Sequence, residues 1–281
     1  MAAEKKEKII KISSVNQDRI IFLLLFLVIA IPMIVPLGLP VPISSTTSKF
    51  YDTVEGIQEG ATVLWCTSMG FSIWYNTGPG EIATFRHIFR LVRERHIKFI
   101  VFAEGAEDAA IDRRIIAEHC DTSGLTYGED YVDLGWIPGG EAALAGVVTD
   151  FQSTVETDYK GTPISQIPML KDIKSGEEID VFGFSSGSMI DRFMRQWAPF
   201  RKPILLNMIA IGVPLCMPYI EKGMVTAYIN GQRGGAEYEK ILGQLGMGSS
   251  FIDAQSMVHL YIIIMIIVVA VWSINRRKKG I

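Results

Sequence analysis

The stretch MVHLYIIIMIIVVAVWSI, residues 257–274, decides how the chain is organised, because it contains no charged side chain. A helix needs roughly 17–25 predominantly apolar residues to cross the hydrocarbon core of a bilayer. Four basic residues follow directly at positions 276–279, and such a flank is typical of the cytoplasmic side. The sequence therefore predicts a transmembrane helix over residues 256–275 and a short cytoplasmic tail over residues 276–281.

A second uncharged run, IIFLLLFLVIAIPMIVP, occupies residues 20–36. Basic residues precede it, and prolines lie where the cleavage site of a signal peptide is expected, so we expect an uncleaved anchor. This interpretation gives a basic cytoplasmic tail at residues 1–19, a transmembrane helix at residues 20–42 and a domain at residues 43–255. Both basic flanks lie outside the domain, which predicts a two-pass protein of the cell membrane with cytoplasmic termini and an extracytoplasmic domain.

The part of the chain between the two basic tails is acidic. Residues 20–275 contain 18 Lys and Arg against 27 Asp and Glu, a net charge of −9 (18 minus 27), whereas the whole 281-residue chain carries −3. An acidic domain repels the phosphates of nucleic acid, so we exclude nucleic-acid binding as its function.

The sequence predicts neither a metal site nor a cofactor. Cys66, Cys120 and Cys216 show no CxxC or Cys/His spacing, so neither zinc nor a disulfide framework is indicated. The stretch GPG at residues 78–80 lacks the rest of a dinucleotide-binding fingerprint, and the chain contains no P-loop.

Short apolar runs alternate with amphipathic segments throughout the domain. The run KFIVFA at Lys98–Ala103 is typical of a buried strand, and the segment that follows it is typical of a helix. Such an alternation predicts an α/β domain with a Rossmann-like, doubly wound parallel sheet that helices cover on both faces. Strands are expected at residues 61–66, 98–103, 131–134, 179–184, 204–209 and 225–229. Helices are expected at residues 81–95, 107–119, 141–150, 187–197, 215–222 and 234–245.

Ligands of doubly wound sheets bind beyond the carboxyl ends of the strands. The polar residues expected there form our candidate ligand site, the crest: Ser68, Glu104, Gly139, Gly140, Ser185, Ser186, Gly187 and Asn230. Helix N-termini expected at Gly140 and Gly187 direct N–H groups into the crest, which favours an anion. Alternatively, glycine and serine occupy these turns for conformational reasons alone.

The motif GFSSG at residues 183–187 satisfies the G-x-S-x-G pattern of hydrolases, with Ser185 as a weak candidate nucleophile. That fold supplies its catalytic histidine after the serine in chain order. The histidine that follows Ser185, His259, lies in the second apolar run, and the others precede the serine in expected helices. A serine without a base is a poor nucleophile, so hydrolysis is kept as an alternative function only.

Several stretches resemble a family of prokaryotic membrane proteins: YGEDYVDLG at residues 127–135, PGGEA at 138–142, TDY at 157–159, GTP at 161–163 and GGAEYE at 234–239. The resemblance implies an α/β domain between two terminal transmembrane helices, and it implies no activity. The GFSSG turn departs from the acidic-Leu-Ser-Ala-Gly turn expected in relatives.

These observations favour a non-catalytic binding or assembly subunit, a scaffold at the membrane surface, over an enzyme. Its expected partners are the lipid bilayer, through the two anchors, and further copies of the chain or other membrane subunits. Two alternatives stay open: a serine hydrolase that uses the GFSSG turn, and a sensor domain that binds a small anion at the crest.

Overall fold

The computed structural model describes residues 14–278, which divide into two units. The α/β domain extends over Leu39–Ser249, close to the expected residues 43–255. The other unit contains the terminal helices, up to Gly38 and from Ser250 onward. Residues 1–13 and 279–281, which include much of the two basic tails expected from the sequence, lie outside the described residues.

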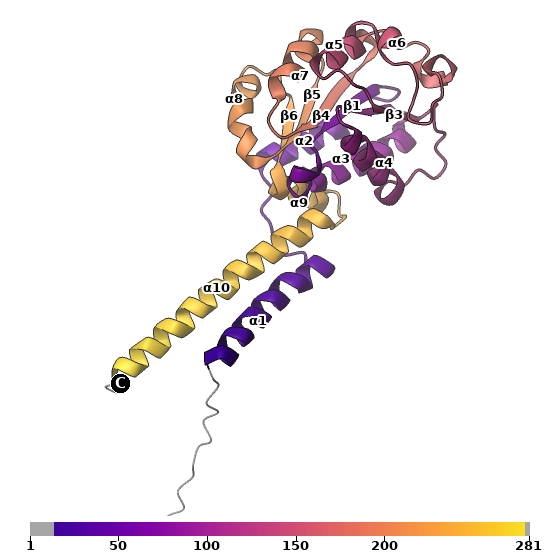
Figure 1. Ribbon diagram of the computed structural model, residues 1–281. Helices are drawn as coiled ribbons and strands as arrows, with labels where there is room; N and C mark the ends of the chain where they lie inside the picture. The colour runs from indigo at the N-terminus through magenta and orange to yellow at the C-terminus, as the bar shows by residue number, and fades with distance from the viewer. Residues whose placement is uncertain (1–13, 279–281) are drawn as a thin grey trace, which may run out of the picture. The chain divides into compact units, whose positions relative to one another are not determined.

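The domain is built on a six-stranded, fully parallel sheet with the strand order β3-β2-β1-β4-β5-β6 (Figure 1). The strands are β1 (Thr62–Ser68), β2 (Lys98–Ala103), β3 (Tyr131–Trp136), β4 (Val181–Ser186), β5 (Ile204–Met208) and β6 (Ala227–Asn230). Their side chains are largely buried on both faces, as the continuous apolar runs predict. The expected α/β class with a parallel sheet is confirmed, and the strand order is that of a Rossmann-like fold.

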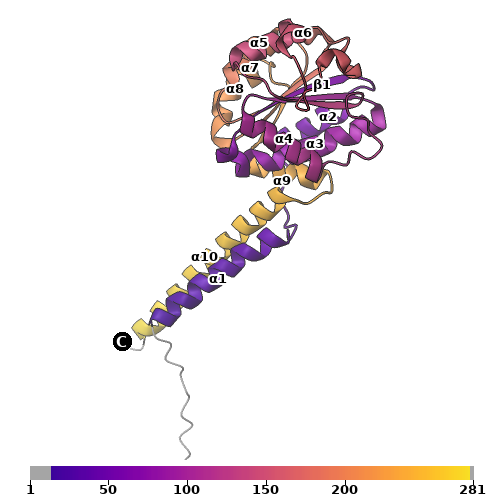
Figure 2. The same cartoon turned by 45° about the vertical axis from the view of Figure 1, so that its right-hand side comes forward.

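One layer of helices covers each face of the sheet (Figure 2). The first layer contains α2 (Ser45–Glu55), α3 (Trp74–Arg95), α4 (Ala106–His119) and α9 (Gly231–Ile241). The second layer contains α5 (Glu141–Thr149), α6 (Phe151–Thr154), α7 (Ile190–Trp197) and α8 (Val213–Glu221). Apolar side chains between each layer and the sheet form two cores: Phe85, Phe89 and Tyr238 belong to the first, and Phe184 and Trp197 to the second.

Helix α3 begins at Trp74 and not at residue 81, where the apolar pattern predicted its start. Gly80 lies within the helix because α9 approaches closely there: a Cβ added at Gly235 would lie 2.7 Å from the Gly80 nitrogen. Pro79 and Gly80 therefore belong to a tight helix–helix contact rather than to a loop.

Residues 151–178 lie between the expected helix at 141–150 and the expected strand at 179–184. They contain α6 and three short 3₁₀ helices, which begin at Ile164, Pro168 and Gly176. The apolar side chains of this segment are buried against the second layer: Ile164, Ile167, Met169, Leu170 and Ile173. The apolar side chains of the segment are therefore part of the core, and Pro163 and Pro168 lie at the starts of two of its 3₁₀ helices.

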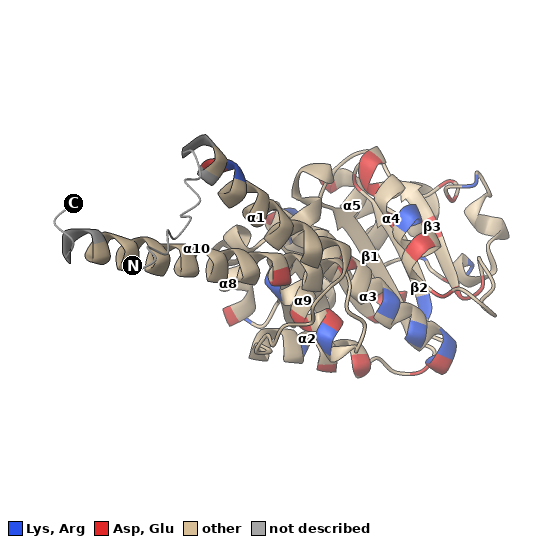
Figure 3. Cartoon of the chain, turned by 90° about the horizontal axis from the view of Figure 1, so that it is seen from below, with Lys and Arg blue, Asp and Glu red and all other residues tan. Residues whose placement is uncertain are grey.

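The terminal unit contains α1 (Ser14–Ile34), with Pro32 inside it, and most of α10 (Met247–Lys278). Among residues 14–278, one helix is long and apolar enough to cross a membrane, the part of α10 over Met247–Asn275, in which an 18-residue window has a mean hydropathy of 2.6. Figure 3 shows charged residues spread over the domain and almost none along α10. The expected N-terminal span at residues 20–42 is not among the helices that meet this requirement, so it stays a prediction.

The two terminal helices contact each other within their unit. The hydroxyl of Tyr261 donates to the carbonyl of Ile21 at 2.9 Å. The Asp253 carboxylate accepts hydrogen bonds from the backbone N–H groups of Leu37 (2.6 Å) and Gly38 (2.8 Å). These bonds connect the two ends of the chain.

Candidate functional site

A pocket of about 550 Å³ opens at the carboxyl edge of the sheet, where β1, β2 and β4 end. We call it the carboxyl-edge pocket. It is lined by Ser68, Met69, Gly70, Ser72, Ile73, Glu104, Gly105, Glu107, Asp108, Gly140, Ser186, Gly187, Ser188, Met189, Arg192 and Ile209. The strand order reverses between β1 and β4, and ligands of doubly wound sheets bind at this switch point.

The pocket brings together five of the crest residues: Ser68, Glu104, Gly140, Ser186 and Gly187. Gly139, Ser185 and Asn230 do not line it. Ser185 is separated from the pocket because it belongs to β4 itself, where successive side chains point to opposite faces of the sheet.

An ion pair between Glu104, which follows β2, and Arg192 on α7 forms one wall of the pocket. Arg192 Nη2 donates to Glu104 Oε2 and to the hydroxyl of Ser68, the latter at 3.1 Å. The Glu104 side chain is 7% exposed and that of Arg192 is 21% exposed. Burial raises the pKa of Glu104, against the lowering effects of Ser68 and Arg192.

Two polar atoms of this ion pair have no hydrogen-bond partner among the described residues. They are Oε1 of Glu104, an acceptor, and Nε of Arg192, a donor, and both are buried. A buried polar atom without a partner costs free energy, so a ligand or water is expected to complete the set. Sequence analysis missed Arg192. The feature that could have indicated it is a basic residue near the start of the helix that follows the GFSSG turn.

The turn after β1 is held by Asp108 of α4. The Asp108 carboxylate accepts the N–H groups of Met69 (3.1 Å) and Gly70 (2.6 Å), and burial raises its pKa. With Glu104 and Glu107 it gives the pocket lining three carboxyl groups against the single guanidinium of Arg192. This excess of acidic groups disfavours a small anion, which was the ligand expected for the crest.

Ser185 does not line the pocket and is fully buried under α3. Its hydroxyl donates to Glu81 Oε2 and accepts from the amide of Asn207 at 3.1 Å. In the described chain the left-handed non-glycine residues are His96 and Arg201, so Ser185 does not occupy the strained turn of a hydrolase nucleophile.

No imidazole within residues 14–278 is hydrogen-bonded to Ser185. The buried imidazole of His87 instead contacts the hydroxyl of Tyr238 (2.5 Å) and the carboxylate of Glu55 (2.9 Å). Burial lowers the pKa of His87 to about 4, so this ring is neutral at physiological pH. The geometry therefore offers Ser185 a carboxyl group and an amide as neighbours but no histidine base.

The carboxyl group that Ser185 contacts, Glu81, is the centre of a buried polar network. Glu81 accepts from the indole of Trp65 (2.7 Å) and the amide of Asn207 (3.1 Å), and it lies 2.9 Å from the hydroxyl of Thr67. Burial raises the pKa of Glu81 to about 7, although these donors and Ser185 oppose the shift. Sequence analysis did not identify this glutamate, because it lies on a helix with an otherwise ordinary apolar pattern.

Thr67 also lies 2.7 Å from Oδ1 of Asp112, which is fully buried. A hydroxyl carries one hydrogen and can donate to only one of the two carboxyl groups, so the other must donate to Thr67. Glu81 already accepts from Trp65 and Asn207, whereas Oδ2 of Asp112 has no partner within residues 14–278, so Asp112 is the acid that keeps the proton. Burial and the neighbouring Glu81 raise the pKa of Asp112 well above its usual range. Asp112 therefore donates a hydrogen bond to the hydroxyl of Thr67, and this hydroxyl donates to Glu81.

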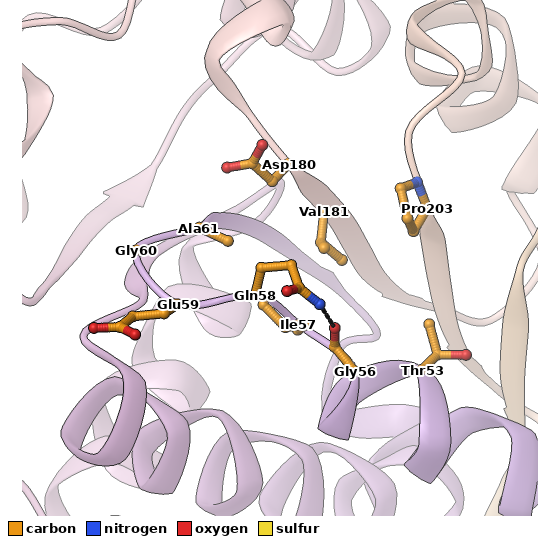
Figure 4. Close-up of a pocket in the computed structure, with 10 residues that line it drawn as sticks. All are labelled: Thr53, Gly56, Ile57, Gln58, Glu59, Gly60, Ala61, Asp180, Val181 and Pro203. Atoms are coloured by element: carbon orange, nitrogen blue, oxygen red, sulfur yellow. Dashed lines mark hydrogen bonds between the residues drawn. The ribbon is translucent and has the colours of Figure 1, made fainter.

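A second cavity, of about 350 Å³, lies at the amino edge of the sheet (Figure 4). Its polar side chains are satisfied locally: Asp180 accepts the N–H of Thr62 at 2.8 Å, and Gln58 donates to the carbonyl of Gly56 at 2.9 Å. None of the unpartnered buried side-chain atoms within the described chain belongs to its lining. This cavity therefore gives no reason to expect a ligand.

Three of the stretches on which the resemblance rests, 127–135, 157–159 and 161–163, meet at Asp158. Its carboxylate accepts from the N–H groups of Lys160 (2.9 Å) and Thr162 (2.8 Å) and from the hydroxyl of Tyr127 (2.9 Å). The neighbouring Asp133 accepts the N–H of Gly135 at 2.7 Å. These residues stabilise turns near β3 and do not line the carboxyl-edge pocket.

No protein-family model matches the chain, and no curated protein is significantly similar to it. Within residues 14–278, no group of three or more His, Cys, Asp or Glu side chains is arranged to hold a metal ion.

Proposed function

We propose that the protein is a membrane-anchored, non-catalytic binding domain whose carboxyl-edge pocket takes a small polar molecule. The observation that carries this proposal is the buried pair of Glu104 and Arg192, whose Oε1 and Nε atoms lack partners at the switch point of the sheet. The pocket volume lies within the roughly 300–1,000 Å³ of ordinary small-molecule sites.

A binding role is favoured over hydrolysis by the position of Ser185. A nucleophile must reach its substrate, whereas this hydroxyl is fully buried, bonds to Glu81 and Asn207 and does not line the pocket. The pocket lining contains four serines but no histidine: Ser68, Ser72, Ser186 and Ser188.

The anchoring part of the proposal is supported by α10, which is long and apolar enough to cross a bilayer. We further propose that residues 20–42 form a second span, that both termini are cytoplasmic and that the domain is extracytoplasmic. The uncharged run at residues 20–36 and the basic residues outside both runs support this orientation.

Ligand binding is tested on the full chain in mild detergent, by thermal unfolding with a panel of sugars, nucleosides, amino acids, polyamines and inorganic phosphate. At least one compound should raise the Tm of the wild type and not that of Ser188→Trp, in which an indole fills the pocket mouth. Gln58→Trp, at the amino-edge cavity, is the matched control and should respond like the wild type. A panel without effect on the wild-type Tm contradicts the proposal.

A second candidate function, assembly with other membrane subunits or a second copy, is favoured by exposed apolar side chains beside the pocket. Ile211 is 84% exposed, Met189 60% and Leu215 58%. Exposed apolar clusters are typical of interfaces. Ile211→Ser with Leu215→Ser should then lower the native mass in mild detergent; an unchanged mass removes this support.

A further inference from the structure

We propose that the ligand of the carboxyl-edge pocket is an uncharged nucleoside, recognised through the vicinal hydroxyls of its sugar by Glu104 and Arg192. This inference rests on the proposed binding function and adds the chemical class of the ligand. It is argued from the two unpartnered polar atoms, from the apolar lining and from the occupied turn after β1.

The Glu104–Arg192 pair matches a diol. One oxygen of Glu104 is already bonded to Arg192, which leaves Oε1 as an acceptor and Arg192 Nε as a donor. One hydroxyl of a vicinal diol donates to the carboxylate while its neighbour accepts from the guanidinium, so both atoms gain partners. In doubly wound sheets an acidic residue in a comparable position bonds the ribose hydroxyls of a dinucleotide.

The rest of the pocket lining suits a flat apolar ring. Met69, Ile73, Met189 and Ile209 contribute apolar surface to the same cavity. Methionine adapts its shape and makes favourable contacts between its sulfur and aromatic rings. A molecule with a sugar at one end and a nucleobase at the other therefore fits both parts of the lining.

The turn after β1 argues against a phosphate. In dinucleotide-binding sheets the backbone of this turn approaches the pyrophosphate. Here the N–H groups of Met69 and Gly70 are already bonded to the Asp108 carboxylate, and Glu107 is adjacent. A protein carboxylate thus occupies the place of the anion, and a phosphorylated ligand meets repulsion.

The test measures, by isothermal titration calorimetry on the full chain in detergent, the binding of adenosine, guanosine, cytidine and uridine. At least one should bind; the 2′,3′-dideoxy analogue and the 5′-monophosphate of the tightest nucleoside should each bind about tenfold more weakly or worse. Equal affinity for the dideoxy analogue, or for the monophosphate, overturns the inference.

Glu104→Gln separates direct recognition from a structural effect. It should weaken binding of the nucleoside, while binding of the dideoxy analogue stays unchanged. Glu141→Gln is the matched control, because Glu141 also pairs with an arginine of α7, Arg195, at 2.7 Å but does not line the pocket. A Glu104→Gln variant that weakens both ligands equally contradicts direct recognition; if it does not fold, the comparison of analogues on the wild type still decides.

The two proposals fail in different ways. If no nucleoside binds but another compound of the panel raises the Tm in the wild type and not in Ser188→Trp, the ligand class is wrong and the binding function stands. If nothing in the panel acts on the wild type, both are wrong.

Discussion

The hydroxyl of Thr67 sets the protonation state of the buried polar network. It lies within hydrogen-bond distance of both Glu81 and Asp112, and its single hydrogen requires one of these acids to keep a proton. Glu81 faces two groups that can only donate, Trp65 and Asn207 Nδ2, and therefore suits the ionised form. Asp112 has an unpartnered second oxygen and is more easily kept neutral.

This assignment predicts how Asp112→Asn changes the pH dependence of stability. The folded-state pKa of Asp112 is raised, so above pH ~4 the unfolded chain ionises while the folded chain keeps its proton, and the folded state loses stability as pH rises. The uncharged amide of the variant removes this loss. The unfolding free energy of the variant relative to the wild type should increase from pH 5 to pH 8, by up to about 1.4 kcal/mol per pH unit. A difference that is constant with pH contradicts the assignment.

The neighbouring substitution Glu81→Gln should behave differently, although it is also isosteric. Trp65 and Asn207 donate to opposite oxygens of Glu81, so either orientation of a glutamine amide places its NH₂ group against an N–H donor. We expect a loss of about 1–3 kcal/mol at neutral pH, seen as a lower Tm. A Glu81→Gln variant as stable as the wild type would show that these donors do not require a carboxylate.

The first glycine of the GFSSG motif is required by packing. A Cβ at Gly183 would overlap the ring of the fully buried Trp65, whereas at Gly187 it would meet only the end of the Ile73 side chain, at 3.1 Å. Gly183→Ala should therefore destabilise the domain by about 3 kcal/mol, the upper end of overpacking, and Gly187→Ala much less. Thermal unfolding of the two variants compares them directly; equal losses contradict the role of Trp65.

At the scale of elements, the sequence predicted strands well and helix starts less well. Strand β2 begins and ends as expected, because its apolar run is continuous. The start of α3 was misplaced because Gly80 and Pro79 read as a loop, whereas close packing against Gly235 of α9 stabilises them in a helix. Propensity near these glycines was overridden by a contact that is distant in sequence.

The residues of the candidate site were also predictable only in part. Glu104 and Ser186 could be placed at the carboxyl edge because the ends of parallel strands meet there. Ser185 was expected beyond the end of its strand, at the crest. The strand β4 instead continues to Ser186, and the alternation of side chains along it turns Ser185 toward α3. Arg192 was not predicted as a site residue, because only the winding of the chain brings α7 to the pocket.

Two glutamates of α9, two residues apart, accept hydrogen bonds at the starts of two different helices, α2 and α10. Glu239 accepts the N–H groups of Gly246 (3.0 Å), Gly248 (2.9 Å) and Ser249 (2.8 Å), at the start of α10. Glu237 instead accepts the N–H of Ser44, which precedes α2, at 3.0 Å, and the hydroxyl of the same residue at 2.6 Å. Both carboxylates satisfy N–H groups that a helix start leaves unpaired.

This arrangement predicts a local effect of Glu239→Gln. Its amide replaces one accepting oxygen with a donor, so hydrogen–deuterium exchange at residues 246–249 should accelerate, with a loss of about 1–3 kcal/mol. Glu237→Gln is the matched control and should accelerate exchange near the start of α2 instead. If both variants accelerate exchange at the same residues, the two carboxylates do not act separately.

At the scale of the whole molecule, the proposed two-pass orientation rests on the two terminal helices and on the charged residues beside them. The bond between Tyr261 and Ile21 connects α10 to α1 within the terminal unit, as expected if both helices share one bilayer. The basic residues outside both apolar runs favour a cytoplasmic position for the two termini.

Cysteine labelling of intact cells tests this orientation, because the three native cysteines are expected to react little with a maleimide. Cys66 and Cys216 are buried, and burial raises the pKa of Cys120 to about 12, so little reactive thiolate is present at pH 7. A membrane-impermeant maleimide should label Lys171→Cys, at an exposed position of the domain, without cell lysis. Ala3→Cys and Gly280→Cys should be labelled only after lysis. Labelling of Gly280→Cys but not of Ala3→Cys in intact cells indicates a single span. Labelling of both terminal cysteines but not of Lys171→Cys indicates the opposite orientation. Either result contradicts two cytoplasmic termini.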